Sequence, residues 1–497
     1  MSNRIPQEEL NSYLWNAAVL LRTHIDAGAY KQYIFPLLFF KRISDVYDEE
    51  TAEALDASNG DAEYAALPEN HGFAVPDGAH WNDIRETTEN VGKAIVSAFH
   101  LIEAANDEKL RGIFGDAAWT NKKRLTDRLL KDLVEHFSTK TLSIENCPED
   151  ELGQGYEYLI KKFADDSGHT AQEFYTNRTV VHLMTEMLQP HSGESIYDPT
   201  CGSAGMLISA IAHLKQHGEE WRNVHCFGQE INQLSSAIGR MNLFLHGVED
   251  FVIENDDTLQ HPAFLKNGKI RTFDMVLANP PYSIKQWNRD VFAADAYGRN
   301  FLGTPPQGRA DYAFIQHILK SMDPKTGRCA ILLPHGVLFR NEESSMRQKL
   351  IESDLIEAVI GLGANLFFNS PMEACVLICR SAKPEFRRGR ILFIEASNEV
   401  IRRNAQSYLE DAHIDKIVNA YNCDEDISGF SAYGDSESFA ANDYSLSIPL
   451  YVKTAQGGSS LDELQVDELV ETWRASSLHA RQEFQNVCSL LAESTGE

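Results

Sequence analysis

The sequence contains no long apolar run and has few basic residues for its length. Its longest apolar stretch, Tyr33 to Phe40, is far shorter than the roughly 20 residues that cross a bilayer. The first ten residues lack the apolar core of a signal peptide, so we expect a cytoplasmic protein with no membrane contact. Acids outnumber bases by 73 to 45, which gives a formal net charge of -28. A protein that held nucleic acid alone would need a basic face, so a nucleic-acid substrate here requires a partner that supplies much of the grip.

Cysteine pairs and metal-ligand patterns are also missing. The eight cysteines form no CxxC pair, and no Cys/His cluster shows zinc-ligand spacing. We therefore expect buried thiols, with no disulfide framework and no metal site. A hydrophobic content of 43% excludes a disordered or fibrous chain, and 497 residues allow roughly two to four domains.

The hydrophobic pattern divides the chain into three parts. Apolar residues at helical spacing predict an all-helical domain over residues 1–145, suited to subunit or DNA contacts. From 146 to 455, short apolar runs alternate with helical stretches, which predicts an α/β domain with a doubly wound, mostly parallel sheet. Residues 456–497 are predicted to form a helical tail for partner docking. The strands expected in the sheet are 195–198, 224–229, 251–254, 273–278, 328–333, 356–362 and 374–379.

The candidate catalytic residues are Asn279, Pro280, Pro281 and Tyr282, which directly follow a buried run. Two prolines end the strand ladder, so the asparagine is held at the carboxyl end of a strand. If the Asn279 side-chain oxygen and the Pro280 carbonyl each accept one N–H of a planar amine, the nitrogen lone pair becomes available for a methyl displacement. Tyr282 can stack on the planar group. The alternative is a turn that only ends the strand.

A loop of small residues follows the first strand. Asp198 ends that strand, and Gly202, Ser203, Ala204 and Gly205 lead into a helix. Small side chains allow backbone N–H groups to approach a ligand at the helix N-terminus, and Asp198 is placed to meet a cationic amine. The loop does not match the GxGxxG dinucleotide pattern. A plain tight turn is the alternative.

Acids follow the next two strands. Glu230 is positioned to bind ribose hydroxyls, and Asp257 to accept from an adenine amine. Each acid taken alone is better explained as a solvated loop residue. However, the loop at Asp198, Glu230, Asp257 and Asn279 follow four successive strands, and this order favours a single ligand-binding edge.

A polar and aromatic segment precedes the first strand. Thr176 suits the N-cap of the following helix, and the two aromatic side chains could instead pack in the core. The segment consists of Glu173, Phe174, Tyr175, Thr176, Asn177 and Arg178.

Seven segments carry a resemblance to a known family. Residues 150–380 resemble amino-methyltransferases that use S-adenosylmethionine to modify adenine in DNA, and more closely the chain is similar to the modification subunits of type I restriction-modification systems. The matching segments are 14–45, 173–184, 197–208, 273–282, 309–319, 327–340 and 442–452.

The resemblance implies a fold, a cofactor and partners. It implies a seven-strand methyltransferase sheet that binds S-adenosyl-L-methionine and methylates adenine N6. Residues 173–178 and 202–205 would contact the methionine part of the cofactor. Glu230 would hold its ribose and Asp257 its adenine, while residues 279–282 would bind the target adenine. The implied partners are double-stranded DNA, a specificity subunit that reads the sequence, a second modification subunit and a restriction subunit.

Two departures and two other functions accompany this interpretation. Ala204 stands where such loops often have glycine, and residues 366–373 replace an aromatic segment usual on the substrate side. The segment 283–308, with Lys285, Trp287 and Arg289, is either a DNA-facing loop or an unstructured insertion. One alternative is a protein glutamine N-methyltransferase, which uses the same motif on a glutamine side-chain amide with the same planar NH2 group. The third possibility is a catalytically silent methyltransferase-like scaffold.

Overall fold

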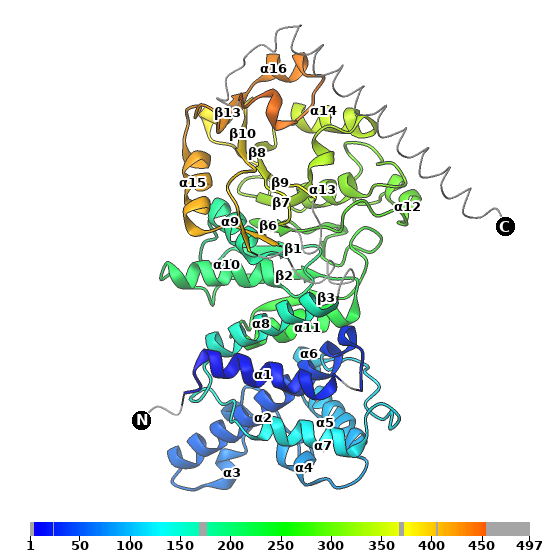
Figure 1. Cartoon of the computed structure of the whole chain (residues 1–497), viewed down its shortest axis with the longest axis vertical. Helices are drawn as coiled ribbons and strands as arrows, with labels where there is room; N and C mark the ends of the chain where they lie inside the picture. The colour runs from blue at the N-terminus through cyan, green and yellow to red at the C-terminus, as the bar shows by residue number, and fades with distance from the viewer. Residues whose placement is uncertain (1–3, 23, 168–175, 367–371, 404–405, 454–497) are drawn as a thin grey trace, which may run out of the picture.

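The computed structural model describes residues 4–22, 24–167, 176–366, 372–403 and 406–453. The amino-terminal helices form the lower part of the molecule in Figure 1, and the sheet with its covering helices forms the upper part. In these described ranges, no helix is long and apolar enough to cross a membrane. The helical tail expected for 456–497 lies outside the described residues.

The lower part is built from helices, as the hydrophobic pattern predicts. In the first of them, Leu10, Leu14, Ala17 and Leu21 recur at helical spacing and are fully buried. The connection between the second and fourth of these helices contains a short α-helix and the 3-10 helix Pro68–Asn70. The helices of this part are α1 (Gln7–Leu21), α2 (Lys31–Ala57), α3 (Ala62–Ala65), α4 (Trp81–Glu86), α5 (Val91–Ala105), α6 (Asp107–Leu110), α7 (Asp127–Ser138) and α8 (Glu149–Ser167).

The upper part contains a nine-stranded sheet in the order β13-β10-β8-β9-β7-β6-β1-β2-β3. Its α/β class and mostly parallel, doubly wound arrangement are confirmed, with β9 antiparallel to both of its neighbours. The seven strands expected from the sequence are all present. They are β1 (Ser195–Asp198), β2 (His225–Gln229), β3 (Phe251–Glu254), β6 (Met275–Ala278), β7 (Arg328–Pro334), β8 (Ile356–Leu362) and β9 (Ala374–Arg380).

The expected number of seven strands is wrong, because two more strands extend the sheet beyond β8. β10 (Ile391–Ala396) pairs in parallel with β8, and β13 (Ser431–Gly434) closes the edge in the antiparallel direction. The four residues of β13 are too few to give a clear pattern of alternation. The remaining strands form two small hairpins, β4 (Leu265–Lys266) with β5 (Lys269–Ile270), and β11 (Ile401–Arg403) with β12 (Gln406–Tyr408).

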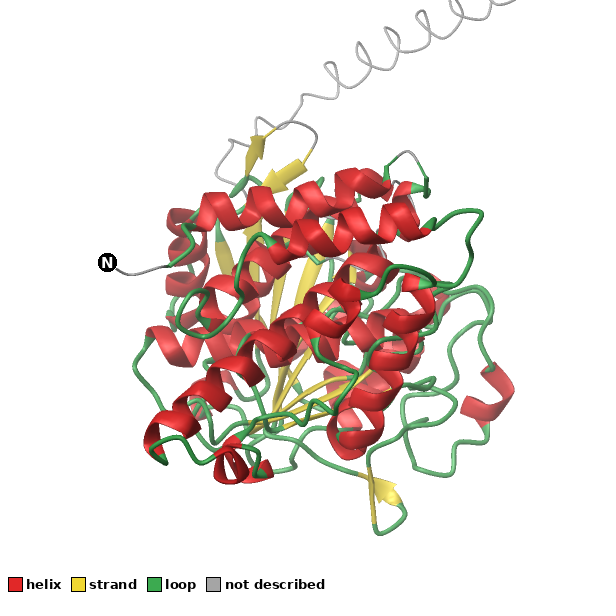
Figure 2. Cartoon of the chain, turned by 90° about the horizontal axis from the view of Figure 1, so that it is seen from below, coloured by secondary structure: helices red, strands yellow, loops and turns green. Residues whose placement is uncertain are grey.

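Helices cover both faces of the sheet, which explains why its central strands are continuous apolar runs rather than alternating ones. Seen from below in Figure 2, the strands lie behind a layer of helices. One face packs against α9 (Arg178–Leu188), α10 (Gly205–Gln216) and α15 (Asp411–Asn422). The other face packs against α13 (Asp311–Lys320), α14 (Ser344–Glu352) and α16 (Ser436–Ala441).

The two parts of the molecule share a continuous core through one helix. On α11 (Gln233–Leu245), Ile238 and Met241 are buried among the helices of the lower part, whereas Leu243 packs into the core beneath the sheet. The Tyr156 hydroxyl of α8 lies 3.3 Å from the Ile238 carbonyl oxygen. Figure 1 shows α8 and α11 together at the junction of the two parts. The lower part is therefore packed directly against an element of the sheet domain.

The strand order locates a binding edge. The chain runs outward through β1, β2 and β3 on one side, and through β6 and β7 on the other, so the order reverses between β1 and β6. In open α/β sheets ligands bind at such a reversal, beyond the carboxyl ends of the strands. Asp198 ends β1 and Asn279 directly follows β6, so the two candidate groups stand at adjacent strand ends.

Candidate active site

Asp198 is a buried carboxyl group at the reversal point, only 1% exposed. Burial raises its pKa to about 7, and the nearby Glu230 carboxylate acts in the same direction, whereas the N–H of Thr200, 2.9 Å from Oδ1, lowers it. Within the described part of the chain, no Lys, Arg or His forms an ion pair with Asp198. A cationic ligand at this strand end would compensate the buried charge.

The loop after Asp198 is held at both ends by neighbouring strands. The Gly202 N–H donates to Glu230 Oε2 over 3.0 Å, and the Thr258 hydroxyl donates to the Pro199 carbonyl over 2.6 Å. Ala204 completes the turn in the left-handed region at a φ of 62°, a conformation that a side chain disfavours. The substitution of alanine for glycine therefore leaves the turn in the conformation that glycine would take.

A partly buried ion pair supports the same loop from the side of the lower helices. Arg178, at the start of α9, donates to both carboxylate oxygens of Glu157 on α8 at 2.5 and 3.0 Å, and to the Ser203 hydroxyl at 3.3 Å. Burial raises the pKa of Glu157, but Arg178 outweighs it and the net shift is downward. Asn242 of α11 donates to Glu157 Oε1 and to the Ser203 carbonyl. A Cβ atom on Gly205 would lie 1.7 Å from the Arg178 guanidinium, so any side chain there would push the guanidinium away from its partners.

The acids of the next two strand ends shape the backbone around the loop. Besides Gly202, Glu230 accepts from the N–H of Asn232 at 2.8 Å. Asp257 Oδ1 accepts from the N–H groups of Leu259 and Gln260 at 2.9 and 3.0 Å, which closes a turn. Both carboxylates stand at the ligand-binding edge, and both also have a local structural role.

Asn279 has a hydrogen-bond partner on each side of its carboxamide. Its Nδ2 donates to the Thr176 hydroxyl over 2.9 Å, and the Tyr282 hydroxyl donates to its Oδ1. Burial raises the pKa of Tyr282 well above its usual range, so the hydroxyl stays a donor. The expected N-cap role of Thr176 is wrong, because Asn177 caps α9 by accepting from the Thr179 N–H. Thr176 instead orients the amide of Asn279.

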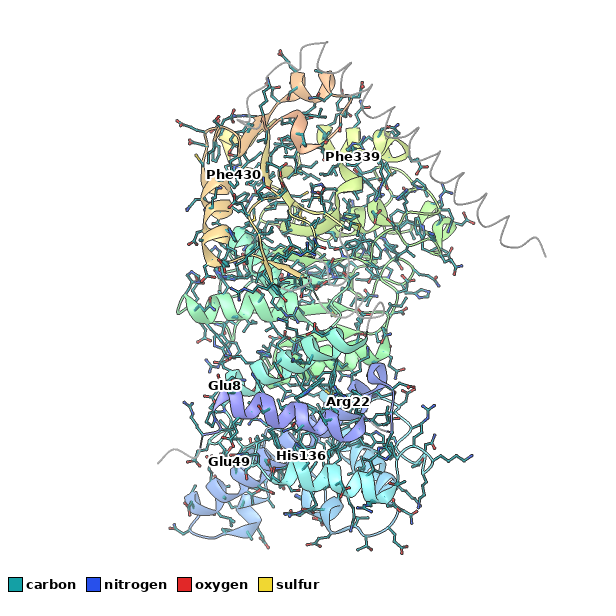
Figure 3. All side chains as sticks on the ribbon, viewed as in Figure 1. Glu8, Arg22, Glu49, His136, Phe339 and Phe430 are labelled. Atoms are coloured by element: carbon teal, nitrogen blue, oxygen red, sulfur yellow. The ribbon has the colours of Figure 1, made fainter. Side chains whose placement is uncertain are left out.

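A second network holds the turn after Tyr282. The Ser283 N–H donates to Asp311 Oδ1 over 2.9 Å, and Arg340 donates to the other oxygen of Asp311 over 2.7 Å. Glu343, 3.6 Å from Arg340, is fully buried, and burial raises its pKa to about 7 although Arg340 opposes this. Phe339, 50% exposed, precedes Arg340 and lies across the upper part from Phe430 in Figure 3.

The segment 283–308 is not an unstructured insertion. Arg299 is 1% exposed, forms an ion pair of 2.7 Å with Asp295, and donates to the carbonyls of Thr258 and Leu259 at 2.9 and 2.8 Å. The segment also forms the short helix α12 (Arg289–Ala293). It is therefore fastened to the turn that follows Asp257.

The structure brings most of the predicted site residues to one edge. Asp198 accepts from the Thr200 N–H and Glu230 from the Gly202 N–H, so both acids hold the loop that follows β1. Two residues apart in the sequence, Arg178 donates to Ser203 and Thr176 accepts from Asn279. The Asn177 amide turns away and donates to the Leu366 and Ser407 carbonyls. Glu173, Phe174 and Tyr175 lie outside the described residues.

Sequence reasoning missed the residues that support the site from behind. Glu157 and Asn242 lie on helices whose patterns indicate only packing. Asp311 and Arg340 fall within the segments 309–319 and 327–340 that carry the family resemblance. That resemblance is the one feature of the sequence that could have identified them as site residues.

Comparison with known proteins places the chain in a family. Residues 148–459 match the family described as N-6 DNA Methylase, and residues 10–137 match the HsdM N-terminal domain. The chain belongs to the N-6 DNA methylases. Among them it is a modification subunit of type I restriction-modification systems, an adenine-specific DNA methyltransferase.

Relatives and a solved structure agree with this assignment over nearly the whole chain. The type I restriction enzyme MjaVII methylase subunit of Methanocaldococcus jannaschii is 32% identical over 471 residues, which cover 90% of this chain and 78% of that protein. The HindI methylase subunit of Haemophilus influenzae is 29% identical, with coverage of 77% and 90%. The crystal structure of a type I methyltransferase subunit from Streptococcus thermophilus superposes with a TM-score of 0.79 at 32% identity, covering 90% of this chain and all of that one. These matches leave the glutamine methyltransferase and silent scaffold without support.

Proposed function

We propose that the edge formed by Asp198, the Gly202–Gly205 loop, Glu230 and Asp257 binds S-adenosylmethionine, and that Asn279 presents the adenine amine to it. The observation that carries this proposal is the adjacency of a buried, uncompensated carboxyl group after β1 and a fixed carboxamide after β6. The bound cofactor supplies an electrophilic methyl group on a sulfonium.

The donor set suits such a ligand. Asp198 meets the cationic amine of the methionine part, and the N-terminus of α10 faces its carboxylate. Glu230, held against the loop by the Gly202 N–H, faces the ribose, and Asp257 faces the adenine ring. Three carboxylates at three successive strand ends match a ligand with a cationic amine, two ribose hydroxyls and an exocyclic amine.

The target half of the site orients the nucleophile. The Thr176 hydroxyl accepts from Asn279 Nδ2, which leaves Oδ1 as the acceptor of the carboxamide, and in the free protein the Tyr282 hydroxyl donates to it. The adenine amine replaces that hydroxyl, and Pro280 offers its carbonyl to the second N–H. Two acceptors stabilise the positive charge that develops on the nitrogen during transfer. The Tyr282 ring then stacks on the base.

An adenine in duplex DNA reaches Asn279 only after it leaves the base stack, which costs a few kcal/mol. We assign DNA contact to the carboxyl edge of the sheet, with the exposed Phe339 and the fastened segment 283–308 beside it. Because the chain carries a net charge of -28, we assign the additional DNA affinity and the recognition of the DNA sequence to partner subunits.

One face of the lower part is unsuited to DNA. Acidic residues outnumber basic ones in a groove along α2, which is lined by Asp45, Asp48, Glu49, Glu53, Asp56 and Glu145 against Lys41, Arg85 and Lys140. Figure 3 shows Glu49 in this part of the molecule. Phosphates would be repelled there. We assign this groove to a protein partner, the specificity subunit, and the residue ranges 1–145, 146–455 and 456–497 remain the proposed domains.

The test is methylation in the assembled complex. The chain is co-expressed with its specificity subunit, and N6-methyladenine is mapped in the host DNA by single-molecule sequencing. We expect a defined methylated motif, and Asn279→Ala to lower its methylation at least about 100-fold while cofactor binding persists. Asn121→Ala, in the lower part, is the matched control. Methylation that survives in Asn279→Ala would refute the role of the carboxamide.

A further inference from the structure

Two helices that begin at the ligand-binding edge are joined further along by a cluster of metal-ligating side chains. Glu186 lies on α9, His213 on α10, and His217 directly after α10. One ligand atom from each of the three lies within 4.8 Å of the other two. We propose that these residues form a Zn²⁺ site that fastens α9 to α10.

His217 is oriented as a metal-bound histidine usually is. His217 Nδ1 lies 2.8 Å from the His213 carbonyl oxygen, which can only accept, so this nitrogen carries the proton and Nε2 keeps its lone pair. Metal-bound histidines typically donate their second nitrogen to a carbonyl in this way. The His213 and His217 rings lie 4.1 Å apart at 31°, which turns both toward the same side of the helix.

The carboxylate completes the set. Glu186 Oε1 lies 2.7 Å from His213 Nδ1, and His182, one turn earlier on α9, approaches the same oxygen at 3.6 Å. A tetrahedral zinc ion with bonds of about 2.0–2.1 Å would hold its ligand atoms roughly 3.3 Å apart, so small side-chain rotations are enough. A neutral His213 that binds zinc through Nδ1 carries its single proton on Nε2, Glu186 binds as the carboxylate, and water fills the fourth position.

The location gives the site a structural role. Two of its ligands lie on helices, and helices hold ligand geometry better than loops. The side chain of His213 is 6% exposed and that of Glu186 is 21% exposed, whereas His217 is open to solvent, so an ion can enter. The proposal revises the sequence expectation of no metal. The signal in the sequence is the His-x3-His spacing of His213 and His217 at the end of α10.

The test uses the full chain after removal of metal with a chelator. Zinc chloride is titrated by calorimetry, and cobalt(II) is added to read the geometry from its visible absorption. We expect one equivalent of zinc and the intense bands of tetrahedral cobalt. His217→Ala and Glu186→Gln should each weaken zinc binding at least about tenfold.

The matched control is His225→Ala, which removes an exposed histidine paired with Asp250 at 2.5 Å outside the cluster. This variant should bind zinc like the parent. Because His217 is exposed, its replacement leaves the fold intact, and a thermal melt of the metal-free proteins checks this. Equal affinities in parent, His217→Ala and Glu186→Gln, or no micromolar binding by the parent, would overturn the proposal. Methylation is not used as a readout, so the result is independent of the function proposed above.

Discussion

The two halves of the active site are supported from different parts of the molecule. The cofactor half depends on Arg178 and its partner Glu157, which lies on α8, a helix whose apolar side chains pack into the core of the lower helices. The target half depends on Asp311 and Arg340, which both belong to the upper part. Thr176 is the direct bond between them. A displacement of the lower helices should therefore weaken cofactor binding before it changes the position of the Asn279 carboxamide.

The largest effect should come from Arg178→Ala. Arg178 and Glu157 side chains are 28% and 18% exposed, so the variant leaves a largely buried carboxylate unpaired. Removing one partner of such a pair costs about 3 kcal/mol. We expect cofactor affinity, measured by calorimetry, to fall about 100-fold, because the Ser203 loop loses its support.

The matched control for this variant is Arg85→Ala, which breaks a bidentate pair with Glu135 on the surface of the lower part. These side chains are 46% and 55% exposed, so solvent screens the pair and its loss should change neither stability nor cofactor affinity. Equal effects of the two variants would contradict a specific link between α8 and the loop.

The next effect should be confined to the target half. Arg340→Ala removes the cation between Asp311 and Glu343, and the Ser283 turn loses its anchor. We expect kcat for DNA methylation to fall about tenfold or more, with cofactor affinity unchanged and Arg340→Lys restoring part of the rate. Loss of cofactor affinity with kcat unchanged would show that the halves are not separate.

The side chains that support the two halves could not be predicted from the sequence, although the two strand ends that they support could. The apolar run before Asn279 and the small residues after Asp198 each identify a strand end, because their local patterns are strong. The Glu157–Arg178 pair joins residues on different helices, and only the packing of α8 on α11 brings Asn242 to the same carboxylate. Helical periodicity predicts which face is buried, but not which polar group is carried into the buried face.

Tyr282 allows a smaller test within the target half. Its hydroxyl donates to Asn279 Oδ1, while its ring is expected to stack on the base. Tyr282→Phe should keep methylation within about threefold of the parent, whereas Tyr282→Ala should lower it about tenfold, since base stacking is worth about 1–3 kcal/mol. Steady-state methylation assays on an oligonucleotide duplex decide between them. A rate lost equally in both variants would assign the role to the hydroxyl.

The smallest effect concerns pH in the cofactor half. The pKa of Asp198 is raised from 3.8 to about 7, so the protonated form stabilises the free protein at low pH and this contribution is lost as the pH rises toward 7. A cationic amine needs the ionised form. Cofactor affinity should therefore increase severalfold between pH 5.5 and 7, and calorimetry on Asp198→Asn should show a flat profile. A parent protein with no such increase would exclude Asp198 as the amine partner.

The central claim is that one edge of the sheet holds both reactants, with cofactor and target supported separately. A crystal structure of the chain with S-adenosylmethionine tests it most directly. The account predicts the amine beside Asp198, the ribose beside Glu230 and the methyl group facing Asn279, with no contact to Asp311 or Arg340. A cofactor bound elsewhere, or with its methyl group directed away from Asn279, would contradict it.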